Sequence, residues 1–151
     1  MRSYLVVIDE SEEARVALRW AARRAARTGS VVVILAVIPQ AEFVQWGGVQ
    51  AAMEEESRLR AEAMMLQAAD ATEEETGIRP SMVTRKGDPE KAIAELLAER
   101  DDIASLVLGA AADAGPGPLV SHFTGAVAGS LPCPVVIVPG GLDGEALGRL
   151  A

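Results

Sequence analysis

The sequence contains one cysteine and one histidine among its 151 residues. A single cysteine cannot form an internal disulfide, and the two residues together are too few for a Cys/His metal cluster. Aromatic residues make up only 3% of the chain, which disfavours base stacking as a mode of nucleic-acid recognition. Acidic residues outnumber basic ones, and the formal net charge of -8 opposes binding to a phosphate backbone. The composition therefore predicts neither a metal centre nor a nucleic-acid partner.

Long apolar runs are missing as well. The run at residues 4–8 is much shorter than the core of a signal peptide and ends at Asp9. No stretch reaches the length needed to span a bilayer. We therefore expect a cytoplasmic protein without a membrane partner. Because half of the 151 residues are hydrophobic, we expect one globular domain over residues 1–151.

What the sequence does contain is a series of short apolar segments, several of them rich in β-branched residues. Such segments are typical of strands that are buried on both faces of a parallel sheet. They occupy residues 5–8, 31–37, 104–108 and 135–138. A fifth segment, residues 81–86, alternates apolar and polar side chains, which is the pattern of a half-exposed edge strand.

Helix signals fill the gaps between these strands. Ser11 is placed to cap a first helix that Gly29 ends, and Asp88-Pro89 has the composition of another helix start. Two more helices and one loop are predicted at residues 49–75, 121–130 and 41–48. The alternation of strands and helices predicts an α/β fold, a parallel sheet with helices on both faces.

Four local motifs, taken in order, give the chain a family resemblance. They are Val6-Val7-Ile8-Asp9-Glu10-Ser11-Glu12, Gly87-Asp88-Pro89, Leu106-Val107-Leu108-Gly109 and Pro132-Cys133-Pro134-Val135-Val136-Ile137-Val138-Pro139. Together they resemble the universal stress protein family over nearly the whole chain. The resemblance implies a single five-stranded parallel sheet with strand order 3-2-1-4-5, Rossmann-like and adenine-nucleotide alpha-hydrolase-like. It also implies a cytoplasmic homodimer linked to stress survival, in a family of which one branch binds ATP or AMP.

The same resemblance implies a nucleotide site at the carboxyl ends of the first and fourth strands. By position, Asp9 and Val37 match the residues that hold the adenosine in nucleotide-binding members. Leu108 ends the fourth strand, and Gly109 matches the first glycine of a phosphate-binding loop. The family form of that loop is Gly-x-x-Gly, nine residues, then Gly-Ser/Thr.

The rest of this loop departs from the family pattern. The second glycine position falls on Ala112 and the final pair falls on Ser121 and His122, with a spacing one residue short. Phe123 and Thr124 follow, and Thr124 keeps a hydroxyl that can donate to a phosphate. By position, these five residues complete the predicted nucleotide site.

Charge adds a second departure. No Lys or Arg occurs between Arg100 and Arg149, so a triphosphate would meet only His122 and the acidic Asp113. Two hypotheses stay open: a dimeric module that senses ATP or AMP, with Mg²⁺ as an aid, and an interaction module that no longer binds nucleotide. Residues 115–118, rich in Gly and Pro, are either a connector or a rigid lid.

Catalysis has little support in the sequence. A weak ATPase is a third hypothesis, but a hydrolytic triad and a Walker-type loop are both missing from the chain. Nor does any second metal ligand lie at a suitable spacing from His122. We therefore expect no catalytic residues, no metal site and no enzyme.

The last strand carries a prediction about assembly. Residues 135–138 are wholly apolar and, in the implied strand order, lie at one edge of the sheet, whereas the opposite edge carries charged side chains. An unprotected apolar edge pairs readily with another chain. We therefore predict a homodimer through Val135, Val136, Ile137 and Val138, with a further protein partner that the sequence does not identify.

Overall fold

The computed structural model describes residues 1–40 and 47–151. Its strands are β1 (Ser3–Val7), β2 (Val31–Ile38), β3 (Ser81–Lys86), β4 (Ile103–Ala110) and β5 (Val135–Pro139). Its helices are α1 (Glu12–Thr28), α2 (Gly47–Thr76), α3 (Pro89–Glu99), α4 (Pro118–Phe123) and α5 (Gly144–Leu150), with one 3-10 turn, η1 (Ala128–Ser130). Most of the loop predicted at residues 41–48 lies outside the described residues.

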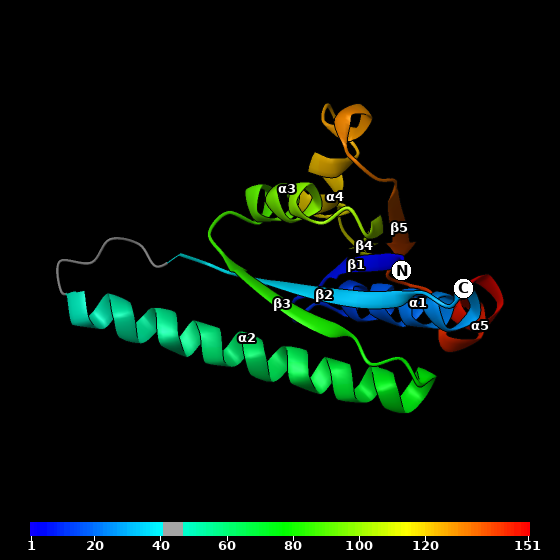
Figure 1. The fold of residues 1–151 in the computed structure, drawn as a ribbon, viewed down its shortest axis with the longest axis horizontal. Helices are drawn as coiled ribbons and strands as arrows, with labels where there is room; N and C mark the ends of the chain where they lie inside the picture. Colours follow the sequence, from blue (N-terminus) through cyan, green and yellow to red (C-terminus); the bar gives the residue numbers. More distant parts are fainter. Residues whose placement is uncertain (41–46) are drawn as a thin grey trace.

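All five strands form one parallel sheet in the order β3-β2-β1-β4-β5, which confirms the predicted fold class. α1, α2 and α5 cover one face of the sheet, and α3 and α4 cover the other (Figure 1). Side chains alternate along β1, so Val6 joins the core beside α1 while Leu5 joins the core beside α3. Because both faces are covered, the central strands are apolar along their length.

Two helices begin where the sequence predicts. The Ser11 hydroxyl accepts the backbone N–H of Ala14 at 3.2 Å and caps α1. The Asp88 carboxylate accepts the N–H of Lys91 at 3.0 Å and caps α3, with Pro89 at the first helical position. These caps satisfy donors that a helix leaves unpaired in its first turn. Since each helix follows a parallel strand, both starts lie at the carboxyl edge of the sheet.

The segment between β4 and β5 differs from the single helix predicted over residues 121–130. α4 begins earlier, at Pro118, and ends at Phe123, and η1 comes after a turn. Gly117 has a φ of 98°, a conformation that side chains disfavour, and it directs the chain into α4. Pro118 suits a first helical position, whereas Gly125 and Gly129 lower the helix propensity of the residues after Phe123.

α2 is held to the molecule mainly by its second half. Met65, Ala69 and Thr72 are buried, while the first turns of α2 extend past the carboxyl edge of the sheet (Figure 1). An ion pair of 2.9 Å between Lys86 and Glu54 ties this part of α2 to the end of β3. Although α2 is long, no helix in the described ranges is also apolar enough to cross a membrane.

A side-chain clamp joins the end of α2 to α1. The Glu75 carboxylate accepts hydrogen bonds from the guanidiniums of Arg19 at 3.0 Å and Arg23 at 2.7 Å. The hydrogen bond from Arg19 is the main cause that holds the pKa of Glu75 below its usual range. The charged form of Glu75 is therefore stabilised by folding.

No helix is predicted from the sequence after residue 138, yet α5 packs on the far end of α1. The Asp143 carboxylate caps its first turn, and Leu147 is fully buried. The Arg27 guanidinium donates to the backbone carbonyl of Gly148 at 2.7 Å and also to that of Ala151. α1 thereby satisfies carbonyls that α5 leaves unpaired at its end.

Candidate functional site

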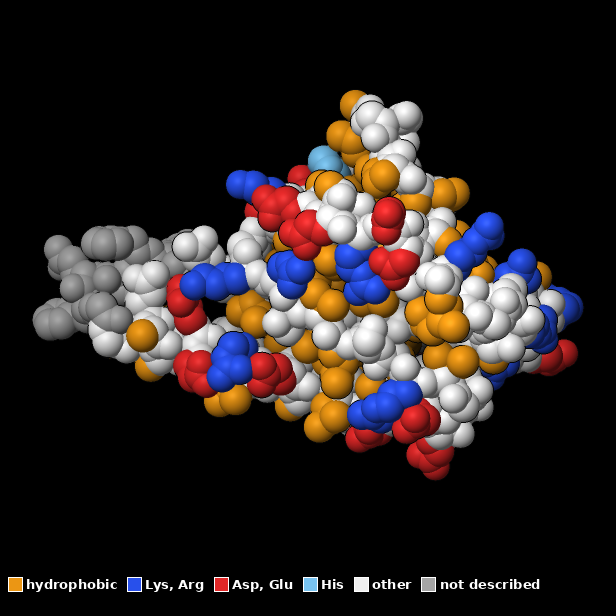
Figure 2. All heavy atoms as spheres, in the orientation of Figure 1, with side chains coloured by type: hydrophobic (Ala, Val, Ile, Leu, Met, Phe, Trp, Pro, Cys, Tyr) orange, Lys and Arg blue, Asp and Glu red, His pale blue; other side chains and the backbone are white. Residues whose placement is uncertain are grey.

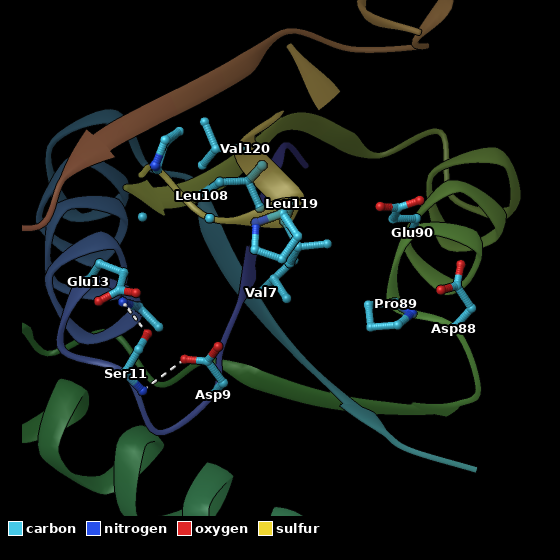
Figure 3. A pocket seen from close by; sticks show the side chains of 15 residues that line it. Val7, Asp9, Ser11, Glu13, Asp88, Pro89, Glu90, Leu108, Leu119 and Val120 are labelled. Carbon is cyan, nitrogen blue, oxygen red and sulfur yellow. Dashed lines mark hydrogen bonds between the residues drawn. The ribbon is translucent and has the colours of Figure 1, made fainter. Parts of the chain in front are cut away.

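β1 and β4 lie side by side, and their carboxyl ends border one cleft, as the sequence predicts. The cleft has a volume of about 370 Å³, near the lower end of the range for small-molecule pockets. The first turns of α1 and α3 and the segment that leads into α4 complete its walls (Figure 3). The lining residues are Val7, Asp9, Ser11, Glu13, Ala14, Asp88, Pro89, Glu90, Leu108, Gly109, Pro116, Gly117, Pro118, Leu119 and Val120.

Asp9 shapes the turn between β1 and α1. Its carboxylate accepts the backbone N–H of Ser11 at 2.8 Å, and the Ser11 hydroxyl in turn accepts the N–H of Ala14 (Figure 3). The side chain is exposed and lines the cleft. Asp9 thus has a structural role as a cap, and its carboxylate is also placed to accept a hydrogen bond from a sugar hydroxyl or a base amino group.

Gly109 brings β4 against the first turn of α1. A Cβ atom at this position would lie 2.1 Å from the carbonyl oxygen of Glu13 and 2.5 Å from its carbonyl carbon. These distances are far inside van der Waals contact, so only glycine permits the approach. The glycine that the family resemblance assigns to the phosphate loop therefore also has a packing role.

Four carboxylates line the cleft. Those of Asp9 and Glu13 lie on one side and those of Asp88 and Glu90 on the other (Figure 3). Among the described residues that line the cleft, none is Lys or Arg. The resulting negative field opposes a highly charged ligand such as a triphosphate.

Residues 116–120 close the cleft on the side of α4. Two of the five are prolines, which restrict the backbone. Val120 is buried and anchors the segment to the core that α3 covers. The predicted Gly/Pro segment therefore contributes a wall of the cleft and is more than a connector.

The predicted phosphate-binding residues at the end of the loop lie in α4 rather than before it. Ser121, His122 and Phe123 are helical, and Thr124 follows the last turn. The N–H of Ser121 bonds to the carbonyl four residues earlier at 3.1 Å, and that of Thr124 bonds to the Val120 carbonyl at 3.0 Å. The Thr124 hydroxyl donates to the same carbonyl at 2.7 Å. These donors are used within the helix, and none of the four residues lines the cleft.

The other predicted residues have identifiable surroundings. Phe123 is 1% exposed and packs in the core, while His122 Nδ1 lies 3.4 Å from Glu90 Oε2 and links α4 to α3. Val37 is half-buried against the core on the α3 face, and Ala112 is exposed. Neither Val37 nor Ala112 lines the cleft. Of the predicted site residues, the structure brings only Asp9, Leu108 and Gly109 into its lining.

Three carboxylates of the lining are absent from the sequence-predicted site, namely Glu13, Asp88 and Glu90. The order and direction of the strands in the sheet place these three residues at the cleft. α1 and α3 each follow a strand of one parallel sheet, so their first turns meet at the same edge. Sequence spacing alone does not reveal this, because residues 13 and 88 are far apart along the chain.

A second and larger hollow, of about 830 Å³, lies between α1 and α2. Its walls include the guanidiniums of Arg15, Arg19 and Arg60, and each of these is ion-paired with a carboxylate of the chain. Because these cations already have partners, the hollow presents no preformed anion site. The cleft between β1 and β4 is therefore the candidate functional site.

A single parallel sheet with helices on both faces, and a cleft where the strand order reverses, defines a doubly wound α/β protein of Rossmann-like type. The chain belongs to the universal stress protein family, whose family model matches residues 1–139. This match confirms the resemblance found in the sequence.

Solved structures of universal stress proteins share this fold. Universal stress protein UspA from Lactobacillus plantarum is 21% identical, with a TM-score of 0.72 over 91% of this chain and 97% of that one. The protein from Archaeoglobus fulgidus in complex with dAMP is 17% identical, with a TM-score of 0.61 over 91% and 98%. A family protein from Arabidopsis thaliana with AMP bound is 18% identical, with a TM-score of 0.55 over 96% and 94%. Among curated proteins, none matches the chain significantly.

Proposed function

We propose that this protein is a stress-response module whose cleft binds the adenosine part of an adenine mononucleotide. The observation that carries the proposal is the cleft at the ends of β1 and β4, which Asp9 and Gly109 line. The sequence resemblance matches these two residues, by position, to nucleotide-binding residues of the family. Doubly wound proteins bind ligands at this switch point of the sheet. The complexes of two similar proteins with dAMP and AMP support the choice of ligand.

Size and charge favour adenosine or AMP over ATP in this proposal. The cleft holds about 370 Å³, and each added phosphate brings negative charge towards the four lining carboxylates. A like-charge pair at about 6 Å costs roughly 1–3 kcal/mol at effective dielectric constants between those of water and a protein surface. Mg²⁺ bound to ATP would offset part of this repulsion.

The proposed activity is binding rather than catalysis. The Ser11 hydroxyl is engaged as the cap of α1, and the His122 imidazole faces Glu90. Neither belongs to the hydrogen-bonded pair of nucleophile and base that hydrolysis requires. Occupancy of the cleft would instead favour one arrangement of residues 116–120 and thereby alter partner binding.

A second candidate function is that of an interaction module that binds no nucleotide. The carboxylate-rich lining favours it, as does the use of the Ser121 and Thr124 backbone donors within α4. Under this alternative the cleft retains the family shape, while the function of the protein resides in contacts with other proteins.

Titration calorimetry with adenosine, AMP and ATP, with and without Mg²⁺, tests the proposal. We expect saturable binding of adenosine and AMP and weaker binding of ATP. Asp9→Ala should lower the affinity for AMP by at least about tenfold. Asp113→Ala changes an exposed carboxylate outside the lining and should leave this affinity unchanged. Glu90→Gln should raise the affinity for AMP about two- to threefold, but not that for adenosine, because it removes a repulsive charge.

The outcomes separate the two candidate functions. Heat signals that remain flat for all three ligands would exclude nucleotide binding and would leave the interaction module as the remaining candidate function. Because Asp9 also accepts a backbone hydrogen bond, circular dichroism of Asp9→Ala must show the wild-type spectrum before its binding is interpreted.

The proposal also includes a cytoplasmic homodimer paired through β5. β5 is an edge strand, and in the described chain its ladder partner is β4. The side chains of Val135, Val136 and Ile137 are only half-buried, so pairing with a second copy would cover them. It would also provide hydrogen-bond partners for the backbone N–H and C=O groups on the open side of β5. Microscopy of a fluorescent fusion checks the compartment.

A further inference from the structure

The hollow between α1 and α2 has the size of a binding site. The two helices cover the same face of the sheet (Figure 1), and each lines the hollow with residues at helical spacing. Its volume of about 830 Å³ lies within the range of small-molecule pockets. Helices that pack together normally fill the space between them with interlocking side chains, so an opening of this size needs a cause.

Small side chains keep the hollow open. Four of its lining residues are alanines, namely Ala14 on α1 and Ala63, Ala68 and Ala71 on α2. The side chains of Leu18 and Met64 add larger apolar surfaces, and a methionine adapts readily to ligands of different shape. The hollow therefore presents a mainly aliphatic surface between the two helices.

Thr72 contributes a buried polar group to this lining. It is only 6% exposed. The hydroxyls of Thr28, Thr76 and Thr124 each donate to the backbone carbonyl four residues earlier, at distances between 2.7 and 3.0 Å. In the described part of the chain, the Thr72 hydroxyl makes neither this hydrogen bond nor any other. The hydroxyl that is both unpartnered and fully enclosed there is that of Ser105, so the Thr72 oxygen stays open to the hollow.

The charges around the hollow favour a neutral ligand. The guanidiniums of Arg15, Arg19 and Arg60 are each ion-paired with a carboxylate of the chain. Asp9 and Glu10 also line the hollow, and within the described ranges neither forms an ion pair. A ligand of either sign thus meets like charge in the walls, whereas a neutral one leaves the existing ion pairs intact.

We propose that the hollow between α1 and α2 binds a small neutral molecule with an apolar body and one hydrogen-bonding oxygen. The apolar body lies against the alanines, Leu18 and Met64, and the oxygen pairs with the Thr72 hydroxyl. This pairing removes the cost of a buried hydroxyl that lacks a hydrogen bond. The site is distinct from the proposed nucleotide cleft, although Asp9 and Ala14 line both.

The test uses the full chain and Nile red, a neutral dye with fused rings and a carbonyl oxygen. We expect a saturable rise in its fluorescence, because its emission increases in apolar surroundings. Thr72→Val keeps the shape of the side chain and removes the hydroxyl, so it should weaken dye binding about three- to tenfold. The same variant should not lower the urea midpoint, since this hydroxyl has no hydrogen bond to lose.

Thr76→Val is the matched control, one turn further along α2. The Thr76 hydroxyl donates to the Thr72 carbonyl at 2.8 Å and accepts the N–H of Ile78 at 3.1 Å, but Thr76 does not line the hollow. Thr76→Val should therefore lower the urea midpoint and leave dye binding unchanged. Equal dye affinities in wild type and Thr72→Val would overturn the proposal.

Two further variants locate the bound dye. Ala71→Trp fills the hollow and should abolish binding, whereas Ala52→Trp adds the same side chain at an exposed alanine outside the lining and should not. Leu66→Ser removes a leucine that is 49% exposed and lies outside the lining, so it should also leave binding unchanged. Binding that survives in Ala71→Trp, or that is lost in Leu66→Ser, would place the dye elsewhere and overturn the proposal.

Other occupants give different outcomes. An anionic dye, anilinonaphthalene sulfonate, that binds as tightly as Nile red would overturn the choice of a neutral ligand. Self-association in sedimentation that Ala71→Trp abolishes would show that a second copy fills the hollow. A wild-type protein that does not bind Nile red would contradict the site altogether. Circular dichroism confirms that each variant is folded, and an unchanged AMP titration in Ala71→Trp shows that the cleft is intact.

Discussion

Gly109 and Gly140 show how single residues fix the wall of the cleft. A Cβ atom on Gly140 would lie 2.8 Å from the Ala110 carbonyl oxygen and 2.8 Å from the Glu13 side chain, and Gly109 is closer still to the Glu13 backbone. The first turn of α1 is therefore held between two strand ends. Packing alone therefore requires glycine at both positions, whether or not the cleft binds a ligand.

The crowding at Gly109 makes a prediction about stability. Gly109→Ala should lower the free energy of unfolding by about 1–3 kcal/mol or more, because a clash with backbone cannot be relieved by a rotamer change. Gly115→Ala has open space within 4 Å and should stay within about 0.5 kcal/mol of wild type. Urea denaturation of the two variants measures this difference. Equal midpoints would show that β4 and α1 are not in close contact.

Residues with a local role could be predicted from the sequence. Ser11 and Asp88 cap helices because their side chains reach backbone donors only a few positions away. The phosphate loop could not be placed in this way. Position along the sequence assigns the end of this loop to Ser121 and His122, whereas Gly117 and Pro118 start α4 early enough to bring Ser121 inside the helix. The start of this helix depends on a backbone conformation that spacing does not encode.

The same distinction holds for whole elements. Four strands could be predicted from continuous apolar runs, and β3 could be predicted from the alternation of apolar and polar side chains that suits an edge strand. α5 could not, since Gly144 and Gly148 disfavour a helix and its seven residues are too few to be stable alone. It exists through tertiary contacts, namely the burial of Leu147 and the hydrogen bonds from Arg27.

The clamp between α1 and α2 leads to a pH-dependent prediction. Glu75→Gln should lower the free energy of unfolding by about 1 kcal/mol at pH 7, because it removes a partly buried ion pair. Pairing lowers the pKa of Glu75, so its contribution is present above the ordinary value of about 4.3 and is lost as the pH falls through the lowered one. The difference from wild type should therefore shrink at pH 3.

Denaturation in urea at pH 7 and pH 3 checks this expectation. Glu74→Gln is the matched control, because Glu74 is its exposed neighbour in the same turn of α2. It should have little effect at either pH. A penalty for Glu75→Gln that does not change with pH would show that the clamp is not ionic.

At the scale of the whole molecule, the two edges of the sheet differ in chemistry. α2 packs against β2 and β3, and it carries eight of the 22 acidic residues of the chain. β5 forms the opposite edge and consists of Val, Ile and Pro. A charged edge, with Arg85 and Lys86 on β3, and an apolar edge are thus separated by the width of the sheet.

The apolar edge leads to a prediction about assembly. Sedimentation at micromolar concentration should show a dimer, and Ile137→Lys should convert it to a monomer, because a charge on β5 opposes edge pairing. Met82→Lys places the same charge on the β3 edge, where Met82 is 42% exposed, and should leave the dimer intact. A monomeric wild type would contradict the prediction, and circular dichroism separates loss of pairing from unfolding.

Each copy of the chain carries a formal net charge of -8, so two copies that approach each other repel before any side chains touch. Added salt screens this repulsion and should speed the association of the proposed dimer without altering the contacts at β5.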